Sequence, residues 1–160
     1  MLIIKNKSIF LYILLFSFFV LLAAYFIQYI LNHKPCNLCL FERLPYFLSI
    51  LLILFLFIVR KYEKIILKLL LFLFLFGFVV SFYHFGIEQG FFSESLVCDL
   101  GNTEKTLSTD ELLKQLETKT ISCKIVTFNL FGLSLATFNT VISLIISVII
   151  IKNLNNYEKN

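Results

Sequence analysis

The chain has 160 residues, of which 59% are hydrophobic and only 15% are charged, and its formal net charge is +4. A typical soluble domain is roughly 45–50% apolar and about 25% charged, so a soluble fold of this length could not bury so much apolar surface. The composition therefore indicates lipid as the solvent. The net charge reflects where lysine and arginine lie relative to the apolar segments, and it gives no case for nucleic-acid binding.

Four long apolar segments follow one another along the chain. A membrane-spanning helix needs about 20 mostly apolar residues, and these runs lack the alternation of a barrel strand. The predicted spans are residues 9–31, 40–59, 65–83 and 126–151. The sequence thus predicts an all-α membrane protein, one domain over residues 1–160, with a four-helix bundle and two external loops at 32–39 and 84–125. The first segment is too long for a signal-peptide core, so we expect a retained helix.

Lysine and arginine gather on one side of this predicted bundle. They precede the first segment, fill the turn between the second and third, and follow the fourth: Lys5, Lys7, Arg60, Lys61, Lys64, Lys68, Lys152 and Lys159. Residues 84–125, on the other side, hold seven acids against four lysines. Basic residues favour the cytoplasmic side, so both termini are predicted to be cytoplasmic.

All four cysteines fall outside the apolar runs, in the two external loops. Cys36 and Cys39 lie in the first loop, and Cys98 and Cys123 lie in the second. In a bacterial inner-membrane protein these loops would face the compartment where disulfides persist. Three interpretations are open: structural disulfides, redox catalysis, or a zinc site with four cysteine ligands. The zinc site is disfavoured because Cys98 and Cys123 do not form a second close pair, and we expect no metal.

The C-x-x-C spacing of Cys36 and Cys39 favours redox catalysis. A disulfide between them closes a very small ring and contributes little stability in the loop-closure model, so it is better suited to opening and closing. The thiols precede an apolar helix, whose N-terminus lowers a thiol pKa. Arg43 follows Cys39 by four residues and would favour the thiolate further. Pro45 predicts either a helix start near Leu44 or a bend there.

The predicted second loop contains a histidine–glutamate pair and a short amphipathic segment. His84 and Glu88 have i, i+4 spacing and could share one helical face at the membrane boundary. Residues 107–119 predict a short amphipathic helix, which would bring Cys98 and Cys123 back together. A single histidine at the membrane boundary more often anchors its helix there than takes part in catalysis. The Glu42–Arg43 pair, considered alone, is also typical of residues that anchor a helix at this boundary.

Three stretches of the sequence resemble the DsbB family of disulfide-bond oxidases: PCNLCLFERLPY, YHFGIEQGFF and CKIVTFNLFGLSLATFN. The second and third are most similar to alphaproteobacterial members, and the resemblance covers residues 9–151. The resemblance implies a protein of the bacterial inner membrane that reoxidises the periplasmic thiol oxidase DsbA and passes the electrons to quinone. A monomer with a transient DsbA-type partner, embedded in lipid, is expected.

The resemblance also implies roles for particular residues. Cys36 and Cys39 match the pair next to quinone, and Cys98 and Cys123 match the loop pair that exchanges with DsbA, with the mixed disulfide at Cys98. Cys39 would face the quinone, and Cys36 would exchange with the loop pair. Arg43 matches the arginine implicated in quinone interaction, and His84 matches a histidine near quinone. Glu42 and Glu88 receive no role.

Other readings remain open at the level of sequence. A quinone oxidoreductase like vitamin K epoxide reductase usually carries its quinone-side C-x-x-C late in the chain, whereas here it is early. A second alternative is a DsbB paralogue dedicated to one secreted substrate. A third is a membrane scaffold with structural disulfides. The scaffold predicts cysteines that stay oxidised when respiration is blocked. The sequence does not distinguish ubiquinone from menaquinone.

Overall fold

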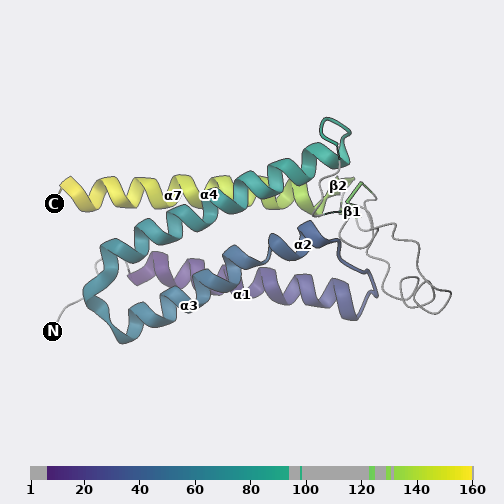
Figure 1. Cartoon of the computed structure of the whole chain (residues 1–160). Helices are drawn as coiled ribbons and strands as arrows, with labels where there is room; N and C mark the ends of the chain where they lie inside the picture. The colour runs from purple at the N-terminus through teal and green to yellow at the C-terminus, as the bar shows by residue number, and fades with distance from the viewer. Residues whose placement is uncertain (1–6, 94–97, 99–122, 125–128, 131, 160) are drawn as a thin grey trace, which may run out of the picture.

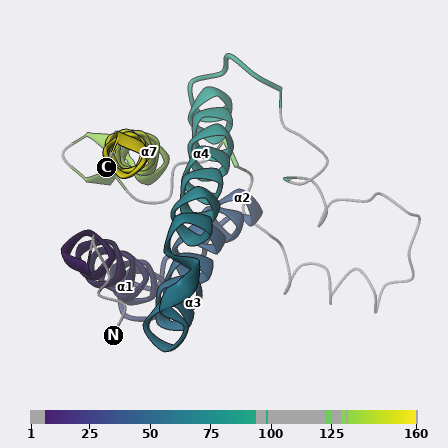
Figure 2. The ribbon, with the colours of Figure 1, turned by 90° about the vertical axis from the view of Figure 1, so that its left-hand side faces the viewer.

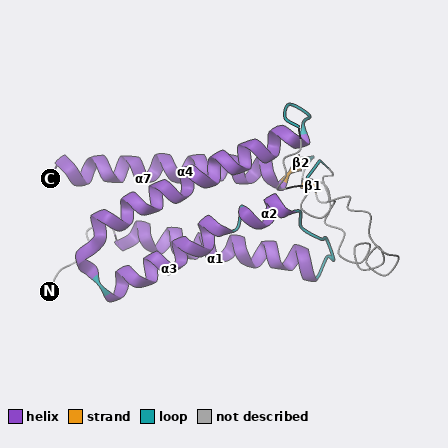
Figure 3. Ribbon diagram, viewed as in Figure 1, coloured by secondary structure: helices purple, strands orange, loops and turns teal. Residues whose placement is uncertain are grey.

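The computed structural model describes residues 7–93, 98, 123–124, 129–130 and 132–159. The predicted helix at 107–119 lies outside these residues. Helices make up nearly all of the described chain (Figure 3). The elements are α1 (Lys7–Tyr29), α2 (Asn37–Phe41), α3 (Leu44–Ile58), the 3-10 turn η1 (Arg60–Tyr62), α4 (Glu63–Glu88), β1 (Asn129–Leu130), β2 (Leu133–Ser134) and α7 (Leu135–Lys159).

The long helices form an elongated bundle (Figure 1). Helix α4 packs most extensively on α7, and α3 contacts both α1 and α4. Viewed from its end, the bundle shows α1 and α7 on one side of α4 (Figure 2). Four segments are long and apolar enough to cross a membrane: Lys7–Tyr29, Asn37–Ile58, Arg60–Glu88 and Leu135–Asn156. The predicted fold class, an all-α membrane protein with four spans, is therefore confirmed.

The bundle buries a narrow apolar core and turns most of its large apolar side chains outward. Phe10, Ile53, Leu56, Leu67 and Phe74 are fully buried where the helices meet. Many other leucines, isoleucines and phenylalanines are exposed along the helices, as lipid-facing side chains should be. Between α1 and α3 the hydroxyls of Ser17 and Ser49 hydrogen-bond at 2.9 Å, the kind of small polar contact that joins helices in membranes.

The second span is broken between α2 and α3, so the two predicted alternatives for Pro45 both hold in part. Pro45 lies in the first turn of α3, where its missing N–H is tolerated. The N–H of Arg43 bonds to Leu40 in a tighter, 3-10 pattern. The expected start of this span at residue 40 is wrong, because helical structure already begins at Asn37.

Helix α4 extends further in both directions than the predicted span 65–83. It runs to Glu88, and Gly90 then adopts a φ of +77°, which glycine tolerates at the end of a helix. The expectation that residue 84 begins the second loop is therefore wrong. A helix can continue past its apolar run when its polar side chains face other protein groups, as His84 does here.

Helix α7 begins at Leu135, so the predicted start of the fourth span at residue 126 is wrong. Before it, β1 and β2 form a small antiparallel hairpin in which Asn129 pairs with Ser134. Gly132 lies between the strands with a φ of +81°. The Ser134 hydroxyl accepts the backbone N–H of Thr137 at 3.2 Å, which is the bond of a helix N-cap. Residues 125–128 lie outside the described chain.

Candidate functional site

Cys36 and Cys39 lie at the start of α2, as the sequence predicts. Cys36 is the N-cap residue, in extended backbone conformation, and its sulfur accepts the backbone N–H of Cys39 at 3.2 Å. Hydrogen bonding from the Cys39 side chain, aided by this backbone bond, lowers the pKa of the Cys36 thiol although burial opposes the shift. Cys36 is buried and Cys39 is half-buried, and both are free thiols.

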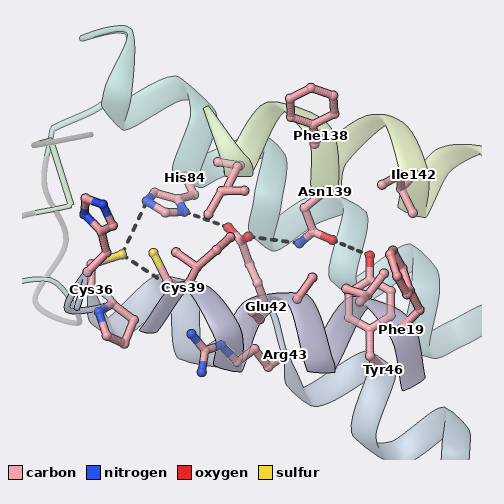
Figure 4. Close-up of a pocket in the computed structure, with 18 of the residues that line it drawn as sticks. Phe19, Cys36, Cys39, Glu42, Arg43, Tyr46, His84, Phe138, Asn139 and Ile142 are labelled. Atoms are coloured by element: carbon pink, nitrogen blue, oxygen red, sulfur yellow. Dashed lines mark hydrogen bonds and ion pairs between the residues drawn. The ribbon is translucent and has the colours of Figure 1, made fainter. Parts of the chain in front are cut away.

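His84 joins this dithiol to a buried carboxylate. Its Nε2 lies 3.5 Å from the sulfur of Cys36, and its Nδ1 lies 2.7 Å from Oε1 of Glu42 (Figure 4). His84 is 3% exposed and Glu42 is 8% exposed, so neither side chain has much water around it. Glu42, to which the sequence analysis gives no role, thus holds the imidazole that faces Cys36.

Asn139 and Tyr46 continue the same chain of hydrogen bonds into the bundle. Asn139 donates its amide N–H to Oε2 of Glu42 at 2.9 Å, and its carbonyl accepts the hydroxyl of Tyr46 (Figure 4). Sequence reasoning did not single out either residue. The available signal was Asn139 itself, because an amide inside an apolar span is costly unless it has a partner in the protein.

Arg43 does not join Glu42. Figure 4 shows the two side chains pointing in opposite directions from the chain. The guanidinium of Arg43 donates to Oε1 of Gln28 at 2.6 Å and lies 5.2 Å from the centre of the Tyr25 ring, so it is held against α1. These contacts of Arg43 are with α1, and its expected effect on the Cys39 thiolate stays a prediction.

Glu88 approaches the same imidazole from the next turn of α4. Its Oε1 lies 3.7 Å from Nε2 of His84, so the predicted i, i+4 relation brings the two side chains together. The Glu88 side chain is 6% exposed, and its Oε2 is buried without a hydrogen-bond partner in the described residues. Such an unsatisfied buried oxygen is unusual and calls for an explanation.

A cavity of about 290 Å³ opens beside the dithiol. Cys36, Cys39, Arg43 and His84 all line it, so the structure brings these four predicted residues to one place. The rest of its wall is mostly apolar and comes from α1 and α7, with Phe16, Phe19, Val20, Ala23, Ala24, Ile27, Phe138 and Ile142. A mostly apolar cavity with a few polar groups at one end is typical of a small-molecule site.

The second cysteine pair lies next to the first. Cys98 and Cys123 are joined by a disulfide with 5.7 Å between their Cα atoms. Both are buried in one cluster with Cys36, Leu38 and Ile87. Because two of the four sulfurs are bonded to each other, the four-cysteine zinc site, already disfavoured, does not form in this structure.

These features define a class of protein. A disulfide and a dithiol meet in one buried cluster at the end of a four-helix membrane bundle, and one of the thiols has a lowered pKa. Thiolate attack on a disulfide is the reaction that such neighbours perform. The fold and the site are those of a multi-pass membrane disulfide oxidoreductase.

Comparison with known proteins then identifies the family. The model of the family described as disulfide bond formation protein DsbB matches residues 6–152, and the chain belongs to this family. The uncharacterized protein RP370 of Rickettsia prowazekii (strain Madrid E) is 28% identical over 142 residues, which are 88% of this chain and 83% of that protein. The SPbeta prophage-derived disulfide bond formation protein B of Bacillus subtilis (strain 168) is 36% identical over 95 residues, which are 59% of this chain and 62% of that protein. The resemblance seen in the sequence is confirmed.

Proposed function

We propose that this protein is a quinone-dependent oxidoreductase that reoxidises a DsbA-type thiol oxidase. One observation carries the proposal. Cys36 shares a buried cluster with the Cys98–Cys123 disulfide, and together with Cys39 it also lines the apolar cavity. A dithiol in this position can receive electrons from a loop disulfide on one side and release them to a lipid-soluble acceptor on the other.

The proposed reaction consists of successive two-electron exchanges. A partner thiolate attacks Cys98, forms a mixed disulfide and releases Cys123, and the partner's second thiol then displaces Cys98 to complete the partner's disulfide. The reduced loop pair next attacks the Cys36–Cys39 disulfide, which becomes a dithiol while the loop disulfide reforms. Finally the dithiol becomes a disulfide again by giving two electrons and two protons to the quinone.

The residues that line the cavity support a quinone as its occupant. Its apolar wall suits a ring and the start of an isoprenoid tail, and its polar end holds the thiols, Arg43 and His84. A bound quinone supplies a two-electron acceptor. In this scheme Nε2 of His84 takes the Cys36 proton, the Glu42 carboxylate holds the imidazole in place, and Arg43 offers positive charge to the reduced ring.

The proposal places the protein in a bacterial inner membrane with the cysteines on the periplasmic side. The basic residues Lys7, Arg60 and Lys152 belong to the opposite end of the bundle. Positive residues favour the cytoplasm, which puts both termini there.

Trapping a covalent complex tests the partner. In the Cys123→Ala variant, Cys98 can exchange with the Cys36–Cys39 disulfide to form a Cys36–Cys98 bond, which a partner thiolate attacks at Cys98. If the partner lacks its second active-site cysteine, neither a partner thiol nor a loop thiol can resolve the mixed disulfide, so it should accumulate. We would express this variant with such a tagged DsbA in a strain that lacks its own oxidase, and examine non-reducing gels. A reducible adduct that disappears when Cys98 is also replaced supports the proposal. If no adduct forms and the wild type does not restore DsbA oxidation, a dedicated paralogue or purely structural disulfides become the better reading.

Quinone kinetics of the purified protein test the acceptor. The Arg43→Gln variant should raise the KM for quinone or lower kcat, because it removes the positive charge at the polar end of the cavity. Arg60→Gln is the matched control, since Arg60 is exposed in η1 and does not line the cavity. Unchanged turnover and KM in Arg43→Gln would show that Arg43 has no such role.

A further inference from the structure

We propose that the reduced protein binds a zinc ion through Cys36, Cys39, His84 and Glu88. The sulfurs of the two cysteines and a ring nitrogen of His84 lie within 4.8 Å of one another. Thiolate and imidazole together favour zinc over the harder divalent ions. The site differs from the four-cysteine site considered from sequence, because it uses one cysteine pair and two side chains of α4.

The spacing of these atoms matches a tetrahedral zinc centre. Zinc–ligand bonds of about 2.3 Å to sulfur and about 2.0–2.2 Å to nitrogen or oxygen put neighbouring ligand atoms roughly 3.3–3.8 Å apart. The sulfur of Cys36 lies 3.5 Å from Nε2 of His84, and that nitrogen lies 3.7 Å from Oε1 of Glu88. Three of the ligands, Cys36, Cys39 and His84, already lie within 4.8 Å of one another, and Glu88 would have to move toward the two sulfurs to complete the site.

His84 is already oriented as a zinc ligand. Its Nδ1 lies 2.7 Å from Oε1 of Glu42, and with the ring proton on Nδ1 the lone pair of Nε2 is directed toward Cys36. Asn139 in turn donates to the second oxygen of Glu42 at 2.9 Å. A carboxylate behind a histidine is the usual outer support of a zinc site, because it fixes the ring and raises its basicity.

Glu88 supplies an independent observation. Its side chain is 6% exposed, and its Oε2 is buried without a hydrogen-bond partner in the part of the chain that the structure describes. An unpartnered carboxylate oxygen in such a place is costly, and a bound cation would remove that cost. Oε1 of Glu88 lies 3.7 Å from Nε2 of His84, so Glu88 is the nearby carboxylate that could turn toward the three-residue cluster and become the fourth ligand.

Zinc binding and oxidation of the dithiol would exclude each other. Zn²⁺ takes both cysteines as thiolates, so binding releases their two protons, and a Cys36–Cys39 disulfide offers no thiolate to the ion. Zinc should therefore hold the protein in its reduced form. The further consequence, that zinc inhibits quinone reduction, rests on the proposed function, whereas binding itself does not.

Cobalt is the probe for the site, because Co²⁺ can replace zinc and its visible spectrum reports tetrahedral thiolate ligation. The full-length protein carrying Cys98→Ala and Cys123→Ala would be reduced in detergent and titrated with Co²⁺. We expect one equivalent to give tetrahedral bands and thiolate charge-transfer bands, which excess Zn²⁺ abolishes. Absence of these bands, or their persistence after the dithiol is oxidised to the disulfide, would overturn the proposal.

Substitutions in this background test the individual ligands. His84→Ala should abolish the bands, and Glu42→Gln should weaken binding by about 10–100-fold by removing the support behind the ligand. Glu88→Gln should weaken binding at least as much, because it removes a ligand. His33→Ala is the matched control, since it deletes the chain's other imidazole from the same cavity. Equal loss in His33→Ala, at unchanged helix content by circular dichroism, would contradict the assigned ligands.

Activity of the wild type separates this proposal from the proposed function. If cobalt binds as expected but the protein never reduces quinone, the metal site stands and the proposed function fails. If quinone is reduced but cobalt does not bind the dithiol, only the metal site fails. If the protein both binds cobalt and reduces quinone, micromolar Zn²⁺ should inhibit quinone reduction and a chelator should restore it. Turnover that saturating Zn²⁺ leaves unchanged would refute the inhibitory role.

Discussion

The site depends on a few polar side chains inside otherwise apolar helices. Glu42, His84, Asn139 and Tyr46 form one hydrogen-bonded chain from the dithiol into the bundle. Each would be costly in lipid alone, and each is satisfied by the next. At the other end of this chain, the sulfur of Cys36 accepts the backbone N–H of Cys39 and faces the imidazole of His84.

The Cys36 pKa can be used to separate the effect of the Cys39 side chain from the effect of the Cys39 backbone N–H. Because the Cys39 side chain is the largest cause of the lowered pKa, replacing it with a hydroxyl should keep most of the shift, and replacing it with a methyl should not. In a Cys98→Ala, Cys123→Ala background, the midpoint pH for alkylation of Cys36 should be lower in Cys39→Ser than in Cys39→Ala. A thiol with a lower pKa is more fully thiolate at a given pH, so its alkylation begins at lower pH.

Mass spectrometry of the Cys36 peptide across a pH series measures both midpoints. The midpoint pH is compared instead of the rate, because burial slows both variants alike. Identical midpoints in the serine and alanine variants would show that the Cys39 side chain does not set the Cys36 pKa.

At the scale of elements, the break between α2 and α3 positions the site. Glu42 and Arg43 lie in this break and point to opposite sides, one toward α4 and one toward α1. Pro45 follows, and its ring packs directly against Gly77 of α4, where a Cβ would come within 3.1 Å of the proline Cγ. A Cβ at this position would therefore require the proline ring to give way by a few tenths of an ångström.

A larger side chain at Gly77 should separate the two helices. Helix propensity alone would favour Gly77→Leu by up to about 1 kcal/mol, but overpacking against a rigid proline costs roughly 1–3 kcal/mol or more. We expect a lower unfolding temperature in detergent and a weaker affinity for quinone. Val79→Leu is the control, because Val79 is 61% exposed on the same helix. A Gly77→Leu protein as stable as Val79→Leu would contradict the packing argument.

The whole molecule has two chemically different ends. The start of α1, the η1 turn and the end of α7 lie at one end of the bundle, and α2 with the β1–β2 hairpin lies at the other (Figure 1). Lys7, Arg60, Lys61, Lys64, Lys68 and Lys152 belong to the first end, and the four cysteines belong to the second. Because the number of spans is even, both termini lie on the same side of the membrane. The basic residues predict that this side is the cytoplasm.

Reporter fusions measure this orientation. Alkaline phosphatase, which is active only outside the cytoplasm, should be active when fused after Gly90 and inactive when fused after Arg60. A fluorescent protein that folds only in the cytoplasm should be fluorescent at the C-terminus. The reverse pattern would show that the bundle is inverted and that the cysteines face the cytoplasm, where disulfides are rarely stable.

The sequence by itself determined the membrane class, the number of spans, the position of the four cysteines outside the apolar runs, and the family. These follow from hydropathy, charge and short motifs, which are properties of contiguous residues. Helix ends were less predictable. His84 lies inside α4 and not in a loop, because its polar side chain is satisfied by Glu42 from another helix.

Only the tertiary structure decided which polar groups meet. Nothing local to Asn139 indicates that it would bond to Glu42, 97 residues earlier in the chain, and nothing local to Arg43 indicates that it would turn to Gln28. The same holds for the group formed by Cys36, Cys39, His84 and Glu88, which depends on how α2 packs beside α4. Side-chain direction and helix packing are set by the bundle as a whole, so partners distant in sequence are settled only when the helices come together.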